Sequence, residues 1–193
     1  MTDRPLWPSP EPIWQAEPDA VSAGSAPRLS GPWRLLLLGD GSPTRHLQSL
    51  TGVAVEVEVI SMAADPNPGR EAPPEVEELE RPLLRRQVWL RCGDDTLAWA
   101  ESWWNQHQAE QHLRQRSQPI WRSLTADRAE LYREVDGLAL VQAPALEEGF
   151  GHPGPYWSRH YRFFRGGREL TVIREVFSPR LQTWLGPAEH ITS

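Results

Sequence analysis

The segment from Arg159 to Phe177 constrains the fold more than any other part of the sequence. It reads RHYRFFRGGRELTVIREVF, with β-branched and aromatic side chains on both sides of Gly166-Gly167. A Gly-Gly pair tolerates positive φ at both central positions of a tight turn, so we predict a β-hairpin. Alternation in the second strand places Glu175 on a face with mostly apolar neighbours. Because burying a bare carboxylate costs several kcal/mol, Glu175 must be paired, protonated or used in chemistry.

Alternating apolar and polar residues predict several further strands. The clearest lies at 53–59, where four valines alternate with alanine and glutamate. A second hairpin is expected at 86–104 and one or two strands at 130–142, with short helices at 44–52 and 105–116. The strand–helix alternation of a doubly wound fold is absent. We therefore predict a single α+β domain, built on an antiparallel sheet of about six strands with short helices packed on one side.

Prolines mark two segments as irregular, because they cluster in residues 5–32 and 66–82. We expect residues 1–28 to form an extended Pro-rich arm and residues 29–193 to form the folded domain. The long segment 61–82 is either a mobile flap or a tolerated excursion of the chain. The chain has 10 Trp, which we expect in the core, although several together could line an aromatic pocket.

Composition argues against several classes of function. The formal net charge of −6 is unsuited to a nucleic-acid surface. No apolar run approaches the roughly 18 residues of a membrane span, and the N-terminus lacks a signal-peptide core. Cys92 is the only cysteine, so no internal disulfide is expected, and we predict a cytosolic protein. The absence of lysine excludes Schiff-base chemistry, and the histidines show no metal-binding spacing.

Arg86 is a second charged residue at the end of an apolar strand face, which it shares with Val88 and Leu90. Arginine holds carboxylates with a planar fork and stays charged when it is buried. Arg86 and Glu175 are therefore either a buried salt bridge or the two polar ends of a pocket for a small anion. Spacing alone favours the salt bridge.

Three segments of the chain resemble chorismate lyase. They are LLLLGDGSPTRHLQSLTG at 35–52, LLRRQVWLRCGD at 83–94 and YWSRHYRFFRGGRELTVIREVFSP at 156–179. The family has an apolar run before a D-S-x-T-type turn, an L-R-x-x-x-L strand, and a W-x-R hairpin that ends in E-x-F-x-P. Their order and spacing agree from about residue 30 to residue 180, and the likeness is nearest to the divergent cyanobacterial branch.

The resemblance implies conversion of chorismate to 4-hydroxybenzoate and pyruvate, without a metal or an organic cofactor. The product would feed the head group of a quinone such as plastoquinone. We expect a monomer whose partners are this substrate and this product, with no nucleic acid and no membrane insertion.

The resemblance also assigns residues to the site. Arg86 matches the arginine that pairs with the ring carboxylate, and Glu175 matches the glutamate near the position of the future phenol hydroxyl. Ile120 and Pro43 match positions whose backbone contacts the ligand. Proline has no N–H, so the second contact passes to a carbonyl or to Thr44.

Arg159 matches the arginine of the W-x-R motif, and is expected to meet the enolpyruvyl carboxylate. The residues leave open whether Glu175 acts as acid, base or positioning group. We expect the 61–82 segment to act as a lid over a product that leaves slowly. The alternative function is a non-catalytic domain of the same fold that senses an aromatic acid. A chromophore-binding barrel is a second alternative, suggested only by the Trp content.

Overall fold

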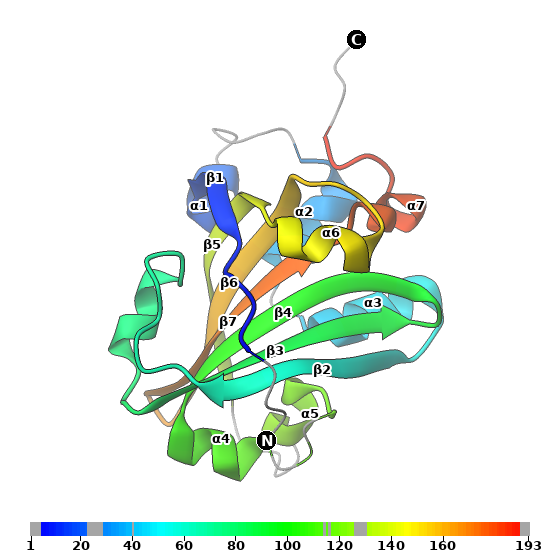
Figure 1. The fold of residues 1–193 in the computed structure, drawn as a ribbon. Coiled ribbons are helices and arrows are strands. Elements are labelled where there is room, and N and C mark those ends of the chain that lie inside the picture. The colour runs from blue at the N-terminus through cyan, green and yellow to red at the C-terminus, as the bar shows by residue number, and fades with distance from the viewer. Residues whose placement is uncertain are drawn as a thin grey trace.

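The computed structural model describes residues 5–22, 29–39, 41–113, 115, 117–125 and 131–189. Its centre is a seven-stranded antiparallel sheet with the strand order β1-β5-β6-β7-β4-β3-β2 (Figure 1). The strands are β1 Glu11–Ala16, β2 Val55–Ala64, β3 Leu83–Cys92, β4 Asp95–Asn105, β5 Tyr132–Gln142, β6 Tyr156–Arg165 and β7 Arg168–Phe177. Strands β2, β3 and β4 cross the view of Figure 1, whereas β5 and β6 run steeply through it, because the sheet is strongly twisted.

The predicted α+β class with one antiparallel sheet is confirmed, with one strand more than the six expected. The added strand is β1, which comes from the Pro-rich arm and pairs with β5 at the edge of the sheet. Proline is tolerated at a sheet edge, and the register shifts between Pro12 and Trp14. Part of the arm is therefore integrated into the sheet.

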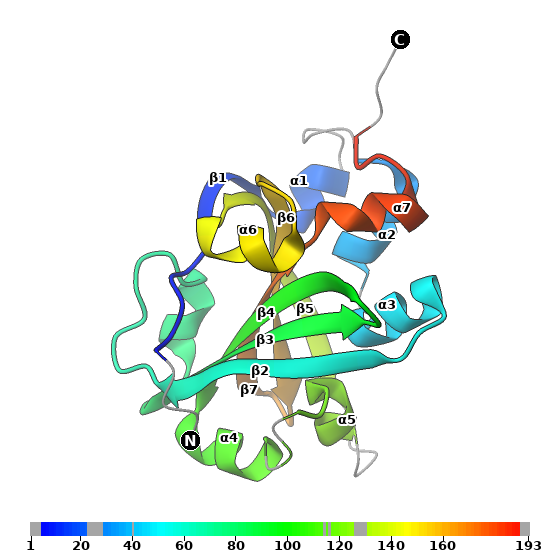
Figure 2. The same cartoon turned by 45° about the vertical axis from the view of Figure 1, so that its right-hand side comes forward.

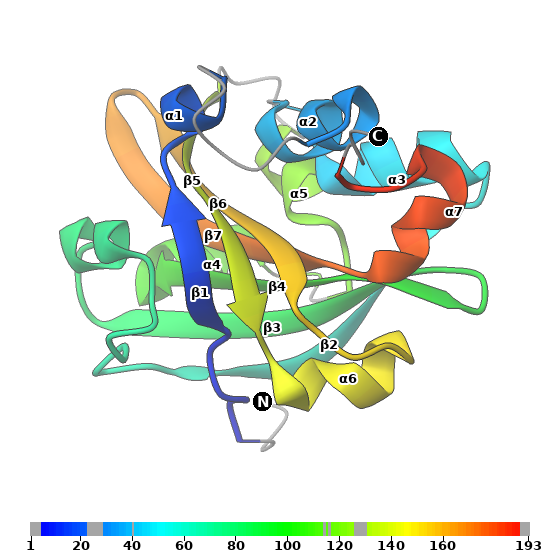
Figure 3. The same ribbon diagram turned by 90° about the horizontal axis from the view of Figure 1, so that it is seen from above.

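Helices lie on both faces of the sheet, not on one side as predicted (Figure 3). They are α1 Pro18–Ser22, α2 Gly31–Leu38, α3 Pro43–Thr51, α4 Gln106–His112, α5 Ile120–Thr125, α6 Pro144–Phe150 and α7 Gln182–Leu185, with short 3₁₀ turns η1 Pro74–Glu78 and η2 Pro179–Leu181. Helices α2, α3 and α5 lie on one side and α6 on the other. The physical reason is that both faces are apolar: α6 packs Leu146 and Phe150 against Trp89 and Trp99.

The two predicted hairpins are present. Gly166 and Gly167 adopt φ values of 56° and 74°, as a tight turn between β6 and β7 requires. The register of this hairpin shifts by one residue between Phe163 and Phe164. Because of this shift, Arg159 stands directly opposite Glu175.

The segment that follows β2 packs on the face of the sheet opposite to α3. Within it, Val76 and Leu79 contact Trp103 and Val172. Figure 2 shows this segment at the end of the molecule remote from α3. No helix in the described ranges is both long and apolar enough to span a membrane.

Candidate ligand-binding site

A narrow cavity of about 40 Å³, partly open to solvent, lies between the sheet and the first residues of α3 and α5. Its wall is largely apolar, with Val57, Val88, Leu90, Ala100 and Ile173 from four neighbouring strands. An apolar wall with a few polar side chains is typical of a site for a small organic ligand.

Arg86 lies in the cavity wall on β3, on the same face as Val88 and Leu90, as the alternation predicted. Only 2% of its surface is exposed. Burial lowers the pKa of Arg86 to about 10, because the charged guanidinium loses contact with water. The side chain remains cationic at neutral pH, and an anionic ligand would compensate its desolvation.

Glu175 lies in the same wall on β7, and two side chains of β6 hold its carboxylate. Arg159 Nε donates to Oε2 at 2.8 Å, and the Tyr161 hydroxyl donates to Oε1 at 2.7 Å. Burial and the neighbouring carboxylate raise the pKa of Tyr161, so its hydroxyl stays protonated and donates. The ion-pair partner of Glu175 among the described residues is therefore Arg159 and not Arg86.

Arg159 does not line the cavity, although the resemblance placed it against a ligand carboxylate. It is fully buried behind Glu175, and its Nη1 donates to the carbonyls of Leu36, Leu37 and Gly39 at the end of α2. These bonds fix the guanidinium between α2 and the sheet. The position of Arg159 suits it to hold Glu175 in place.

The remaining predicted residues, Pro43 and Ile120, both line the cavity. Pro43 is the first residue of α3, and the Ser42 and Thr44 hydroxyls beside it lie 2.8 Å apart. Proline suits this position because the first N–H groups of a helix have no partner within the helix. The N–H of Thr44 is then the first one that α3 presents at this end. Ile120 opens α5 directly after Pro119.

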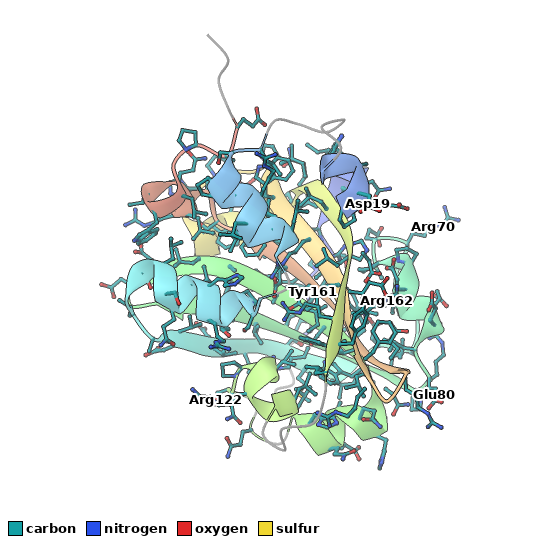
Figure 4. All side chains as sticks on the ribbon, turned by 180° about the vertical axis from the view of Figure 1, so that it is seen from behind. Asp19, Arg70, Glu80, Arg122, Tyr161 and Arg162 are labelled. Atoms are coloured by element: carbon teal, nitrogen blue, oxygen red, sulfur yellow. The ribbon has the colours of Figure 1, made fainter. Side chains whose placement is uncertain are left out.

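Four of the five predicted site residues thus lie around one cavity, and Tyr161 and Arg133 are among the lining residues that sequence reasoning missed. Alternation along β6 places Tyr161 on the face of Arg159, which was an available signal. Figure 4, seen from the side of α3 and α5, shows Tyr161 at the centre of the molecule and Arg122 at its margin. Arg133 had no comparable signal, because the groups that contact its side chain come from segments far from it in the sequence.

The opposite face of the sheet carries a second buried cluster of charges, centred on Glu101, which also borders the cavity. Glu101, which is 1% exposed, accepts from Arg85 Nε at 2.8 Å and from Arg174 Nε at 2.7 Å. Arg85 also donates to Ser9 at 2.8 Å, and so ties the N-terminal arm to the sheet.

No tryptophan is among the described residues that line the cavity, and the fully buried tryptophans belong to the core.

Comparison with solved structures shows the fold. The effector domain of PhnF from Mycobacterium smegmatis aligns with a TM-score of 0.56 and 12% identity, covering 75% of this chain and 92% of that one. The C-terminal domain of the histidine utilization repressor from Pseudomonas syringae pv. tomato aligns with a TM-score of 0.51 and 13% identity, covering 72% and 99%. At such low identity the likeness concerns the fold alone.

Comparison of sequences shows the family. The chain is 32% identical over 164 residues to the uncharacterized protein ycf21 of Porphyra purpurea, covering 83% of this chain and 87% of that protein. The ycf21 protein of Cyanophora paradoxa is 29% identical over 148 residues, covering 76% and 77%. The family model described as Chorismate pyruvate-lyase Rv2949c-like matches residues 37–185, which is most of the chain. The chain belongs to the Rv2949c-like chorismate pyruvate-lyase family.

Proposed function

We propose that this protein converts chorismate to 4-hydroxybenzoate and pyruvate in the cavity between α3, α5 and the sheet. The observation that carries the proposal is that Arg86 and Glu175, on strands far apart in the sequence, line one largely apolar cavity. A buried cation and a carboxylate on a small apolar wall suit an aromatic acid with a hydroxyl on its far side. The family membership supports the same substrate.

In this proposal Arg86 binds the ring carboxylate, because a guanidinium binds a carboxylate with two parallel hydrogen bonds. The backbone at Thr44 and Ile120 contacts the ligand from the opposite wall. The apolar side chains of the strands, which lie between these groups, would pack against the flat ring. The product keeps the same carboxylate, so Arg86 binds substrate and product alike, and 4-hydroxybenzoate should inhibit the enzyme.

The reaction is an elimination in which the C3–O bond breaks, the C4 proton leaves, and the ring becomes aromatic. The departing enolpyruvate takes up a proton to become pyruvate, so the atoms balance. Aromatisation drives the reaction, and the protein has to position the substrate and stabilise the charge that develops on the leaving group.

Glu175 is the group placed to act at C4. Its ion pair with Arg159 requires the carboxylate form, and each carboxylate oxygen keeps a second lone pair for the ligand. We therefore assign Glu175 to accept the hydrogen bond of the C4 hydroxyl or the C4 proton. Arg159 and Tyr161 act through Glu175 by fixing both of its oxygens.

The second candidate function is the binding of an aromatic acid without turnover. It is favoured by the fold likeness to the PhnF effector domain. A sensor of this kind would use the same cavity, so the two functions differ in product formation and not in ligand affinity.

The 4-hydroxybenzoate formed by an enzyme would supply the head group of a quinone such as plastoquinone.

The test is to incubate the purified protein with chorismate, and to quantify 4-hydroxybenzoate by chromatography and pyruvate by a coupled lactate dehydrogenase assay. Equal amounts of both products above the uncatalysed rate are expected. Glu175→Gln should abolish turnover while it retains binding of 4-hydroxybenzoate, and Arg86→Met should lose both. Binding of 4-hydroxybenzoate by the wild type without any turnover would select the sensor.

A further inference from the structure

We infer that Arg133 is a second anion-binding residue of the cavity and holds the enolpyruvyl carboxylate of the substrate. The inference rests on the proposed function, because it assigns one contact to that substrate. In this inference two arginines bind the two carboxylates of the substrate. Arg86 would hold the carboxylate that substrate and product share, and Arg133 would hold the carboxylate that leaves with pyruvate.

The strand order places the two arginines on opposite sides of Glu175. The strands run β5-β6-β7-β4-β3, with Arg133 on β5, Glu175 on β7 and Arg86 on β3. Glu175 is thus two strands away from each arginine. Four strand spacings separate β3 from β5, which is roughly 19 Å between backbones before the sheet curves. A ligand whose reacting carbon lies at Glu175 would have an arginine on either side.

Arg133 packs in the cavity wall while part of its guanidinium is still able to bind. The guanidinium carbon lies 4.4 Å from the centre of the Tyr161 ring and 4.6 Å from that of Phe163. One Nη1 hydrogen bond goes to the Gly41 carbonyl. Its Nε is buried and has no hydrogen-bond partner in the part of the chain that the structure describes. Arginine carries five N–H donors, so a carboxylate could still be bound by two of them.

The charges around the cavity favour a ligand with two negative groups. The positive charge of Arg159 is matched by its ion pair with Glu175. Arg133 forms no ion pair with any of the described residues. Arg133 and Arg86 both line the cavity, so a bound ligand would lie beside two positive charges. Arg159, which the sequence had suggested for the second carboxylate, does not line the cavity. Its Nε donates to Glu175 and its Nη1 to the carbonyls of α2, and its Nη2 is buried without a partner among the described residues.

The two arginines therefore make different predictions for substrate and product. Chorismate has two carboxylates, whereas 4-hydroxybenzoate keeps only the one assigned to Arg86. Removal of the Arg133 charge should weaken the substrate and spare the product. After elimination the ring has lost its contact with Arg133, which also separates the two products.

The experiment compares wild type with Arg133→Met, which keeps an unbranched chain over the Tyr161 and Phe163 rings, and with Arg133→Lys, which restores a positive charge. Arg168→Met is the matched control, because Arg168 is exposed on β7 and does not line the cavity. For each protein, KM and kcat are measured with chorismate. Calorimetry gives the Kd of 4-hydroxybenzoate and of 3-(1-carboxyvinyloxy)benzoate, a non-reactive aromatic ligand with both carboxylates.

Loss of a hydrogen bond between charged groups should weaken the binding of the dianion by roughly 10- to 150-fold in Arg133→Met. KM for chorismate should rise accordingly, the Kd of 4-hydroxybenzoate should stay near the wild-type value, and Arg133→Lys should recover part of the loss. The ratio of the two Kd values is independent of the fraction of folded protein, so it remains decisive if Arg133→Met is poorly stable.

An unchanged Kd ratio in Arg133→Met would overturn the inference, whether both ligands weaken together or neither does. Failure of the proposed function is a distinct result, because the wild type itself would then form no 4-hydroxybenzoate from chorismate. The Kd ratio can still be measured in that case if the wild type binds the two ligands.

Discussion

The buried ion pair between Arg159 and Glu175 makes a quantitative prediction about stability. Their side chains are 0% and 2% exposed, so loss of either partner leaves the other charge uncompensated away from water. Such losses cost about 3–5 kcal/mol in the free energy of unfolding. For a chain of this size that corresponds to a fall in Tm of roughly 6–20 °C for Glu175→Gln.

Arg159→Met should cost more than Glu175→Gln, because it also removes the donor to three carbonyls. These are the carbonyls of Leu36, Leu37 and Gly39 at the end of α2. The double variant Arg159→Met/Glu175→Gln carries no buried charge at this point. Its cost should therefore fall short of the sum of the single costs by about 1.5–3 kcal/mol.

The assay is urea unfolding followed by the intrinsic tryptophan fluorescence of the four proteins. The control cycle uses Glu77 and Arg81, whose side chains are 69% and 44% exposed and lie 3.1 Å apart. Its coupling energy should be only about 0.3–0.5 kcal/mol. Additive costs at Arg159 and Glu175, within the error of the control cycle, would refute the claim that their charges depend on each other.

Three further predictions concern stability alone. Glu101→Gln should lower the free energy of unfolding by about 3–5 kcal/mol in urea titrations, because Arg85 and Arg174 would lose their shared buried carboxylate. A loss below that range would show that water reaches this cluster. Burial raises the pKa of Glu169 to about 7 from 4.5, so its carboxyl favours the folded state below pH 4.5 and this contribution is lost as the pH rises through 7. Glu169→Gln should therefore gain stability relative to wild type between pH 5 and pH 8 in thermal unfolding, and a constant difference would contradict the raised pKa. Gly167→Ala should cost about 1–2 kcal/mol by the same urea assay, because φ is 74° there, and a neutral effect would mean that the turn relaxes.

The hairpin of β6 and β7 shows how far sequence reasoning reached and where it stopped. The Gly166-Gly167 turn and the alternation of β7 predicted both strands and the inward position of Glu175. Counting back from the turn without interruption would place Arg159 opposite Arg174. The register shift between Phe163 and Phe164 places it opposite Glu175 instead. A bulge of this kind depends on packing around the strand, so residue pattern did not indicate the ion pair.

The long segment after β2 is a second case in which local pattern was insufficient. Its prolines predicted irregular structure, and residues 65–82 contain only the short η1 turn. The expectation of a lid fails, because Val76 and Leu79 bury themselves against Trp103 and Val172 on the face away from the cavity. Which face a loop covers depends on where apolar surface remains uncovered, and sequence spacing does not contain that information.

The sequence by itself determined the local elements, because period-2 alternation and glycine turns depend on neighbouring residues alone. It also indicated that Arg86 and Glu175 occupy apolar strand faces. Only the tertiary structure decided which charges meet. The strand order inserts β7 between β4 and β6, and so places Glu175 between Arg86 and Arg133. These contacts depend on pairing between strands far apart in the chain, which is selected by the packing of the whole sheet.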